Sequence, residues 1–182
     1  DMVKFVPVSE TDVKTLDYIR SVYEDSFPVD ERREFDQVER LLKENETFHL
    51  AVIEKDGRGV GLLSYWQWPD WRYVEHFAVD GTCRGKGIGR EILQAFIAED
   101  DTPIVLEVEH PDDDICIRRI RFYESLGFVL HPEYDYIQPP YDATKHPLHL
   151  YLMTSRMTDF ATRYQEIKSR LYAQVYGVEK DV

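Results

Sequence analysis

The most informative segment of the chain is Tyr73-Val-Glu-His-Phe-Ala-Val-Asp-Gly-Thr-Cys-Arg-Gly-Lys-Gly-Ile-Gly-Arg-Glu-Ile-Leu93. It opens with a strand-like run that the turn residues Asp80 and Gly81 end. A glycine-rich loop follows, and Ile88, Ile92 and Phe96 at four-residue spacing then indicate a helix. A strand, a loop and a helix in this order expose backbone N–H groups at a helix N-terminus, where the dipole adds positive charge. The stretch therefore predicts a site for an anion, most often a phosphate.

Two familiar phosphate loops do not match these glycines. A P-loop needs Ser or Thr after Gly-Lys, but Gly87 follows Gly85-Lys86 here. The dinucleotide fingerprint G-x-G-x-x-G fails because Arg90 stands where the third glycine belongs. What remains is Arg84-Gly-Lys-Gly-Ile-Gly89, an R-x-x-G-x-G pattern directly after a strand.

This loop, together with the downstream segment Arg121-Phe-Tyr-Glu-Ser-Leu-Gly-Phe128, resembles the GNAT superfamily of N-acetyltransferases. The resemblance covers most of the chain, from the first helix to a strand ending near Thr154. It implies that the glycine loop binds the pyrophosphate of acetyl-CoA, which is then the co-substrate. In the family, the backbone of the preceding strand bonds the pantetheine arm as an added strand would. The coenzyme-binding residues implied are Phe77, Ala78, Val79, Arg84, Gly85, Lys86, Gly87, Ile88, Gly89, Arg90, Cys116 and Tyr123.

The resemblance also implies a catalytic acid. Tyr123 matches the family's tyrosine, which gives a proton to the departing thiolate; core packing is the alternative interpretation. Cys116 is a departure from the family, which often has asparagine about seven residues before this tyrosine. A thiol is a weaker hydrogen-bonding group, so one contact to pantetheine or to a relay water is in doubt.

Three residues are candidates for the general base that takes the proton from the amine. Glu75 ranks first, because alternation places it on the same strand face as Phe77 and Val79, with His76 on the opposite face. Glu109 ranks second and His110 third, both at the end of the strand expected over 102–109. Each is equally explained as a solvated or ion-paired strand residue, and many superfamily members use a water chain in place of one base.

Four residues are candidates for the amine-acceptor site. In the GNAT fold the loop between the first two helices lies near the amine, which points to Phe27 and Pro28; Phe27 is equally well explained as a core residue at a helix junction. The last two strands border the same pocket, which adds Tyr134 and Tyr136, although these rings could as easily be packing. Asp30, Glu31 and the basic residues around Arg32 are expected to form a solvated face of a helix over 30–43.

Composition limits the partners. The formal charge is −13, from 35 acidic and 22 basic residues, which disfavours non-specific binding to nucleic acid or an anionic membrane. It would attract a cationic amine, although solubility alone explains it too. Cys83 and Cys116 are the only cysteines and lack metal-ligand spacing. With no membrane-length apolar run and no secretory signal, we expect a cytoplasmic protein without a metal.

We expect one α/β GNAT domain over 1–182, with a core over about 2–155 and an added C-terminal helix over about 158–176. A mixed central sheet of about six to seven strands is flanked by helices. Strands are predicted at 2–7, 48–54, 60–68, 73–79, 102–109, 127–136 and 148–154. The added helix packs on the N-terminal helices or on a second subunit of a homodimer.

The sequence thus predicts an acetyl-CoA-dependent N-acetyltransferase in which a primary amine, of a small molecule or a peptide, attacks the thioester directly in a ternary complex. A non-catalytic acyl-CoA-binding or regulatory protein of the same fold is the first alternative. An interaction protein that uses its C-terminal helix, with the coenzyme as a structural part, is the second.

Overall fold

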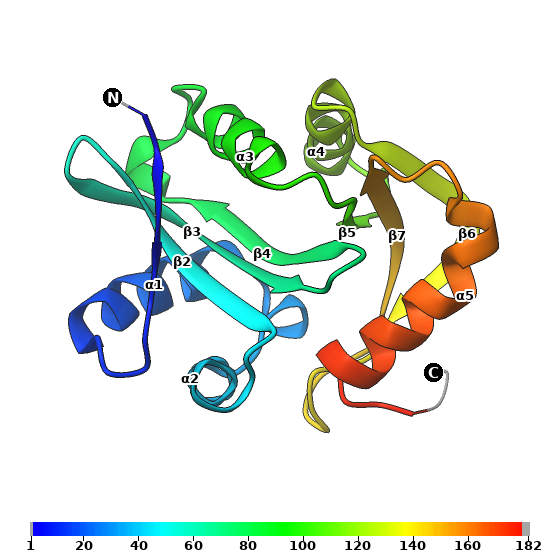
Figure 1. Cartoon of the computed structure of the whole chain (residues 1–182), viewed down its shortest axis with the longest axis horizontal. Coiled ribbons are helices and arrows are strands. Elements are labelled where there is room, and N and C mark those ends of the chain that lie inside the picture. The colour runs from blue at the N-terminus through cyan, green and yellow to red at the C-terminus, as the bar shows by residue number, and fades with distance from the viewer. Residues whose placement is uncertain (1, 180–182) are drawn as a thin grey trace. The chain divides into compact units, whose positions relative to one another are not determined.

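The computed structural model describes residues 2–179 (Figure 1). The chain forms two compact units. The first contains the chain up to Pro28 and residues 32–106, and the second contains Val29–Glu31 and the chain from Glu107 onward. The seven strands belong to one mixed sheet in the order β1-β2-β3-β4-β5-β7-β6, which confirms the predicted fold class.

The first unit is built on antiparallel strands with a parallel addition. β1 (Lys4–Pro7), β2 (Phe48–Lys55), β3 (Arg58–Gln67) and β4 (Arg72–Val79) pair in sequence, and β5 (Ile104–Glu109) runs parallel to β4. Helices α1 (Val13–Ser26) and α2 (Phe35–Glu44) lie along one face of β1–β4, and α3 (Ile88–Glu99) lies on the other (Figure 1).

The second unit combines a hairpin-like strand pair with two helices. β6 (Val129–Gln138) pairs antiparallel with β7 (Leu148–Ser155), and α4 (Asp114–Ser125) precedes them. α5 (Phe160–Arg170) continues into a π-helical turn, Leu171–Val175. Among residues 2–179, none of the helices has the length and hydropathy of a membrane span.

The apolar face of the C-terminal helix is buried within the second unit. Phe160, Tyr164, Ile167 and Leu171 are all at most 6% exposed. Phe160 stacks on His131 with ring centroids 3.8 Å apart, and Tyr164 stacks on Tyr134 at 4.1 Å. This face is therefore covered by the chain itself and needs no second subunit to bury it.

One buried arginine ties the end of α3 to the start of β4. Arg72 is 1% exposed, and its guanidinium donates to the carbonyl oxygens of Phe96 and Asp100, both at 2.9 Å, and of Thr102 at 2.8 Å. A cation at a helix C-terminus is favoured by the dipole and bonds carbonyls that lack helical partners. Arg72 thus stabilises the β4–α3–β5 crossover at the point where the chain leaves α3 and enters β5.

The helix predicted over 30–43 starts later than expected. A single 3-10 turn, Val29–Glu31, is followed by extended backbone at Arg32, and α2 begins only at Phe35. Arg33 lies in this interruption, where it is 8% exposed and its N–H donates to Tyr23 Oη at 2.7 Å. Its tertiary contacts therefore override the local helical pattern.

A β-bulge interrupts β4. Ser64 pairs with His76 while Tyr65 pairs with Val74, so Glu75 is the extra residue. The His76 N–H donates to Ser64 Oγ at 3.1 Å in place of a ladder bond. The parallel pairing of β4 with β5 runs from Arg72↔Ile104 to Val74↔Leu106 and stops just before the bulge. The bulge therefore bends β4 at the point where its pairing with β5 stops.

Candidate active site

The loop after β4 begins with a side-chain-stabilised turn. Asp80 accepts from the Thr82 N–H at 2.9 Å and from the Tyr18 hydroxyl at 2.8 Å. The first of these bonds, then the second, lowers the pKa of the Asp80 carboxyl. An ionised Asp80 therefore holds the turn Gly81–Cys83 and sets the start of the glycine loop.

The glycine loop has the backbone that only glycine adopts easily. Gly85 and Gly87 have φ of +83° and +72°, and open space surrounds the position of a Cβ at both. Gly87 is the N-cap of α3 and supplies no side-chain acceptor to its N–H groups. These donors point into an open cradle that suits an anionic group.

The charges around this cradle are positive. Arg84, Lys86 and Arg90 are exposed there. The acidic residue in the first turn of α3, Glu91, is paired with Lys55, whose Nζ lies 2.5 Å from Glu91 Oε1. The pairing offsets a carboxylate that would otherwise repel a phosphate, so the residues present fit the pyrophosphate of acetyl-CoA.

The end of β4 is set by close backbone packing. A Cβ on Gly61 of β3 would lie 2.3 Å from the carbonyl oxygen of Ala78. Glycine is therefore required for β3 to approach β4 at this point. Phe77, Ala78 and Val79, whose backbone is expected from the family resemblance to hydrogen-bond the pantetheine arm, form the strand end that this packing holds.

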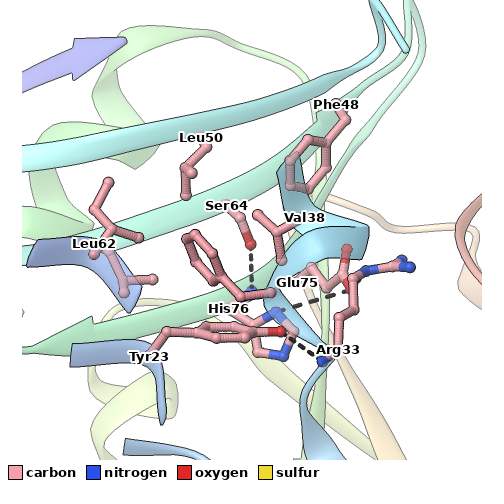
Figure 2. A pocket seen from close by; sticks show the side chains of 11 residues that line it. Tyr23, Arg33, Val38, Phe48, Leu50, Leu62, Ser64, Glu75 and His76 are labelled. Atoms are coloured by element: carbon pink, nitrogen blue, oxygen red, sulfur yellow. Dashed lines mark hydrogen bonds and ion pairs between the residues drawn. The ribbon is translucent and has the colours of Figure 1, made fainter. Parts of the chain in front are cut away.

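Glu75 and His76 both line a small cavity under α1 and α2 (Figure 2). The prediction that they lie on opposite faces is wrong, because the bulge breaks the two-residue alternation. Glu75 Oε2 accepts from Arg33 Nε at 2.9 Å, and Oε1 accepts from Trp66 Nε1 at 2.7 Å. The cavity measures about 10 Å³, close to the least that one water requires.

This burial weighs against Glu75 as the general base. Its side chain is 1% exposed and that of Arg33 is 9% exposed. Both carboxylate oxygens already accept hydrogen bonds, which leave little access for an amine. The role of Glu75 as the general base is still a prediction, and its contacts support the ion-paired interpretation better.

Phe27 lies against the same network. Its ring centroid is 4.7 Å from that of His76 and 5.6 Å from that of Tyr23. Phe27 is half-buried, whereas Pro28 is exposed. The contacts favour the helix-junction interpretation of Phe27 and leave Pro28 accessible.

Tyr123 and Cys116 lie two turns apart on α4, in the second unit. Burial raises the pKa of the Tyr123 hydroxyl to about 12, so it is a neutral donor at pH 7. In the described residues this hydroxyl has no hydrogen-bond partner, although its ring packs against Phe128 at 5.6 Å. Burial, then a hydrogen bond to Asp113, raises the pKa of Cys116 to about 12. Cys116 is thus a neutral thiol and not a nucleophile.

The other candidate bases lie at the end of β5. Glu109 is 40% exposed and accepts from Arg119 Nη1 at 2.8 Å. His110 stacks on Tyr151, with ring centroids 3.9 Å apart. Glu109 is therefore more accessible than Glu75, while the His110 ring is held by stacking.

Glu31 is a candidate base that the sequence did not reveal. It is half-buried, not solvated as predicted, and burial, followed by the charge of Glu109, raises its pKa to about 7. The turn that carries it is held by its neighbour: Asp30 Oδ1 accepts from the His146 N–H at 3.0 Å. A carboxyl with a pKa near 7 suits proton transfer at neutral pH. No local signal marks this residue, because its burial comes from distant segments.

The two predicted acceptor tyrosines both make packing contacts. Tyr136 is 1% exposed and donates to Glu107 at 2.5 Å, and Tyr176 donates to the same carboxylate at 2.7 Å. Tyr134 stacks on Tyr164 of α5. These contacts favour the packing interpretation of both residues. Among the described residues, no three His, Cys, Asp or Glu side chains gather to hold a metal ion.

The chain belongs to the acetyltransferase (GNAT) family. The family model matches residues 16–128, a segment that takes in parts of both units. Acetyl-CoA-dependent N-acetylation is the general activity of this family.

Solved structures agree with this assignment. A GNAT-family structure from Bacteroides thetaiotaomicron is 35% identical, with a TM-score of 0.92, over 96% of this chain and 99% of that chain. The ribosomal-protein-S18-alanine N-acetyltransferase from Escherichia coli is 18% identical, with a TM-score of 0.58, over 87% and 97% of the two chains. A GNAT-family acetyltransferase from Elizabethkingia anophelis with acetyl-CoA bound is 12% identical, with a TM-score of 0.57, over 86% and 99%. The last two show the fold alone. No match was found among curated proteins.

Proposed function

We propose that this protein transfers the acetyl group of acetyl-CoA directly to a primary amine in a ternary complex. The observation that carries the proposal is the uncapped N-terminus of α3 behind a loop of left-handed glycines, with three exposed cations around it. Bound acetyl-CoA would supply an activated acyl group and a thiolate leaving group.

The chain's own residues have distinct roles in this proposal. Backbone N–H groups from Lys86 to Gly89 bind the pyrophosphate, and Arg84 adds a forked donor. The backbone of Phe77–Val79 holds the pantetheine arm. Tyr123 keeps its proton at neutral pH and gives it to the thiolate.

A proton must also leave the amine. Glu109 and Glu31 are the better candidates to accept it, because both are reachable from solvent and Glu31 has a pKa of about 7. Glu75, with both oxygens bonded to Arg33 and Trp66, instead holds the bulge of β4 in place.

The acceptor is an amine on a small molecule or a peptide, and the excess negative charge of the chain favours a cationic one. Both cysteines are free thiols, which suits a reducing cytoplasm. We propose that both units belong to one catalytic domain. A homodimer remains a proposal to be tested by light scattering.

The test compares two glycines with the same backbone. Gly87 and Gly177 both have positive φ, at +72° and +68°, with open space around a Cβ. Glutamate at either position costs similar strain, but only Gly87→Glu places a carboxylate in the phosphate cradle. We expect Gly87→Glu to weaken acetyl-CoA binding at least about a hundredfold by calorimetry, or roughly 2.7 kcal/mol, while Gly177→Glu binds normally.

Wild-type affinity in Gly87→Glu would overturn the assignment of the loop. Thiol release over a panel of amines separates the enzyme from its alternative. Acetyl-CoA binding without turnover on any amine would favour a non-catalytic acyl-CoA-binding protein of the same fold.

A further inference from the structure

A second cavity lies in the first unit at the edge of the sheet. β1 pairs with β2 from Lys4↔Glu54 to Pro7↔Ala51, and the chain then leaves the strand after the Val8 N–H donates to the Leu50 carbonyl at 3.0 Å. The start of β2 therefore keeps an open side, and a cavity of about 360 Å³ lies there. This volume falls within the range of small-molecule sites, roughly 300–1,000 Å³.

The cavity is remote from the glycine loop. It reaches Glu99, the last residue of α3, whereas the loop leads into Ile88, the first. At 1.5 Å of rise per residue, these two ends of the helix are about 16 Å apart. A ligand here would therefore not lie in the coenzyme cradle.

The floor of the cavity is aromatic. The rings of His49 and Tyr65 stack at 5.0 Å with 18° between their planes. Tyr65 packs edge-on against Phe96 at 4.9 Å, which in turn lies 6.2 Å from Phe5. Burial lowers the pKa of His49, so the stacked surface is uncharged at neutral pH. Such a surface suits a flat apolar ring.

The rim of the cavity is negative. Glu46 and Glu99 are exposed members of its lining, which contains no Lys or Arg. Two helices also end here: α2 at Glu44, just before the lining residue Asn45, and α3 at Glu99. Helix C-termini carry partial negative charge, and acidic residues are disfavoured there. Arg72 already bonds the carbonyl oxygens at the end of α3, so the two exposed carboxylates and the C-terminus of α2 are the groups that favour a cation here.

We infer that this cavity is a second binding site that takes a cationic amine with a flat aromatic body. The ring lies on the His49–Tyr65 surface and the ammonium group lies between Glu46 and Glu99. Phe48 and Leu50 line both this cavity and the one that contains Glu75. The site goes beyond the proposed function and is assigned to an effector, because none of the residues given a role in binding acetyl-CoA, in proton transfer or in holding the acceptor lines this cavity.

The probes for this site are tryptamine and its neutral isostere indole-3-ethanol, added to full-length protein saturated with CoA. Binding is followed by the NMR shifts of the His49 and Tyr65 rings. We expect tryptamine to move both rings and to bind at least about tenfold more tightly than indole-3-ethanol. Glu46→Gln/Glu99→Gln should lose at least about tenfold in tryptamine affinity.

A matched variant controls for net charge. Asp17→Asn/Asp25→Asn removes two exposed carboxylates on α1, away from the lining, and should bind tryptamine normally. Acetyl-CoA affinity should be unchanged in both double variants, so the result is independent of the coenzyme site. Equal binding of the two probes, equal losses in the two variants, or no ring shifts at millimolar tryptamine would each overturn the inference.

Discussion

Arg33→Met tests the buried ion pair that joins the α1–α2 connection to the bulge of β4. Arg33 Nε lies 2.9 Å from Glu75 Oε2, and the two side chains are 9% and 1% exposed. Removing one partner of a buried pair leaves an uncompensated charge, which typically costs about 3–5 kcal/mol. At about 2–4 °C per kcal/mol for a chain of this size, we expect the melting temperature to fall by about 6–20 °C.

The assay is thermal denaturation for the melting temperature and urea denaturation for the free energy of unfolding, both followed by tryptophan fluorescence, since Trp66 donates a hydrogen bond to Glu75. Arg20→Met is the matched control: Arg20 lies 3.2 Å from Glu24, but the pair is 57% and 41% exposed. Its loss should cost less than about 1 kcal/mol. Arg33→Met/Glu75→Gln should recover much of the stability lost in Arg33→Met, because the buried charge is then absent. A loss in Arg33→Met no larger than in Arg20→Met would refute the reasoning.

Three further predictions concern single residues. The pKa of Glu31 is raised from 4.5 to about 7, so its ionisation destabilises the folded state increasingly as pH rises from 4.5 through 7. After a discount for partial exposure of the side chain, this lowers the free energy of unfolding above pH 7 by about 1–2 kcal/mol. Glu31→Gln should therefore raise the melting temperature by about 2–8 °C at pH 8 and by none at pH 4, and a gain independent of pH would contradict this cause. Gly61→Ala places a Cβ 2.3 Å from the Ala78 carbonyl oxygen, so it should lower the free energy of unfolding by about 1–3 kcal/mol. It should also weaken acetyl-CoA binding, measured by calorimetry. Unchanged stability would show that β3 and β4 can separate here without cost. Tyr123→Phe should lower kcat by about a hundredfold with acetyl-CoA affinity unchanged, and an unaltered kcat in the thiol-release assay would remove Tyr123 as the acid.

The glycine loop and most of the helices and strands could be predicted from the spacing of residues that are close in sequence. The order of strand, turn, glycines and helix over 73–96 depends on residues close in sequence, so it was correct without tertiary information. The same holds for the predicted strand at 48–54 and for the helix with Ile88, Ile92 and Phe96 on its buried side. Amphipathic periodicity is a local property, and burial follows it wherever the whole element packs on the sheet.

The positions, burial and pKa values of the charged groups near the candidate site depend on the tertiary structure and could not be predicted from the sequence. The bulge at Glu75 arises from how β3 and β4 pair, and it placed Glu75 and His76 together where alternation separated them. Arg33 interrupted a helical pattern because its partners come from Tyr23 and Glu75. Glu31 acquired its raised pKa from burial and from Glu109, which lies 78 positions later in the chain. The free energy of a charge depends on its surroundings in space, and no spacing along the chain encodes those surroundings.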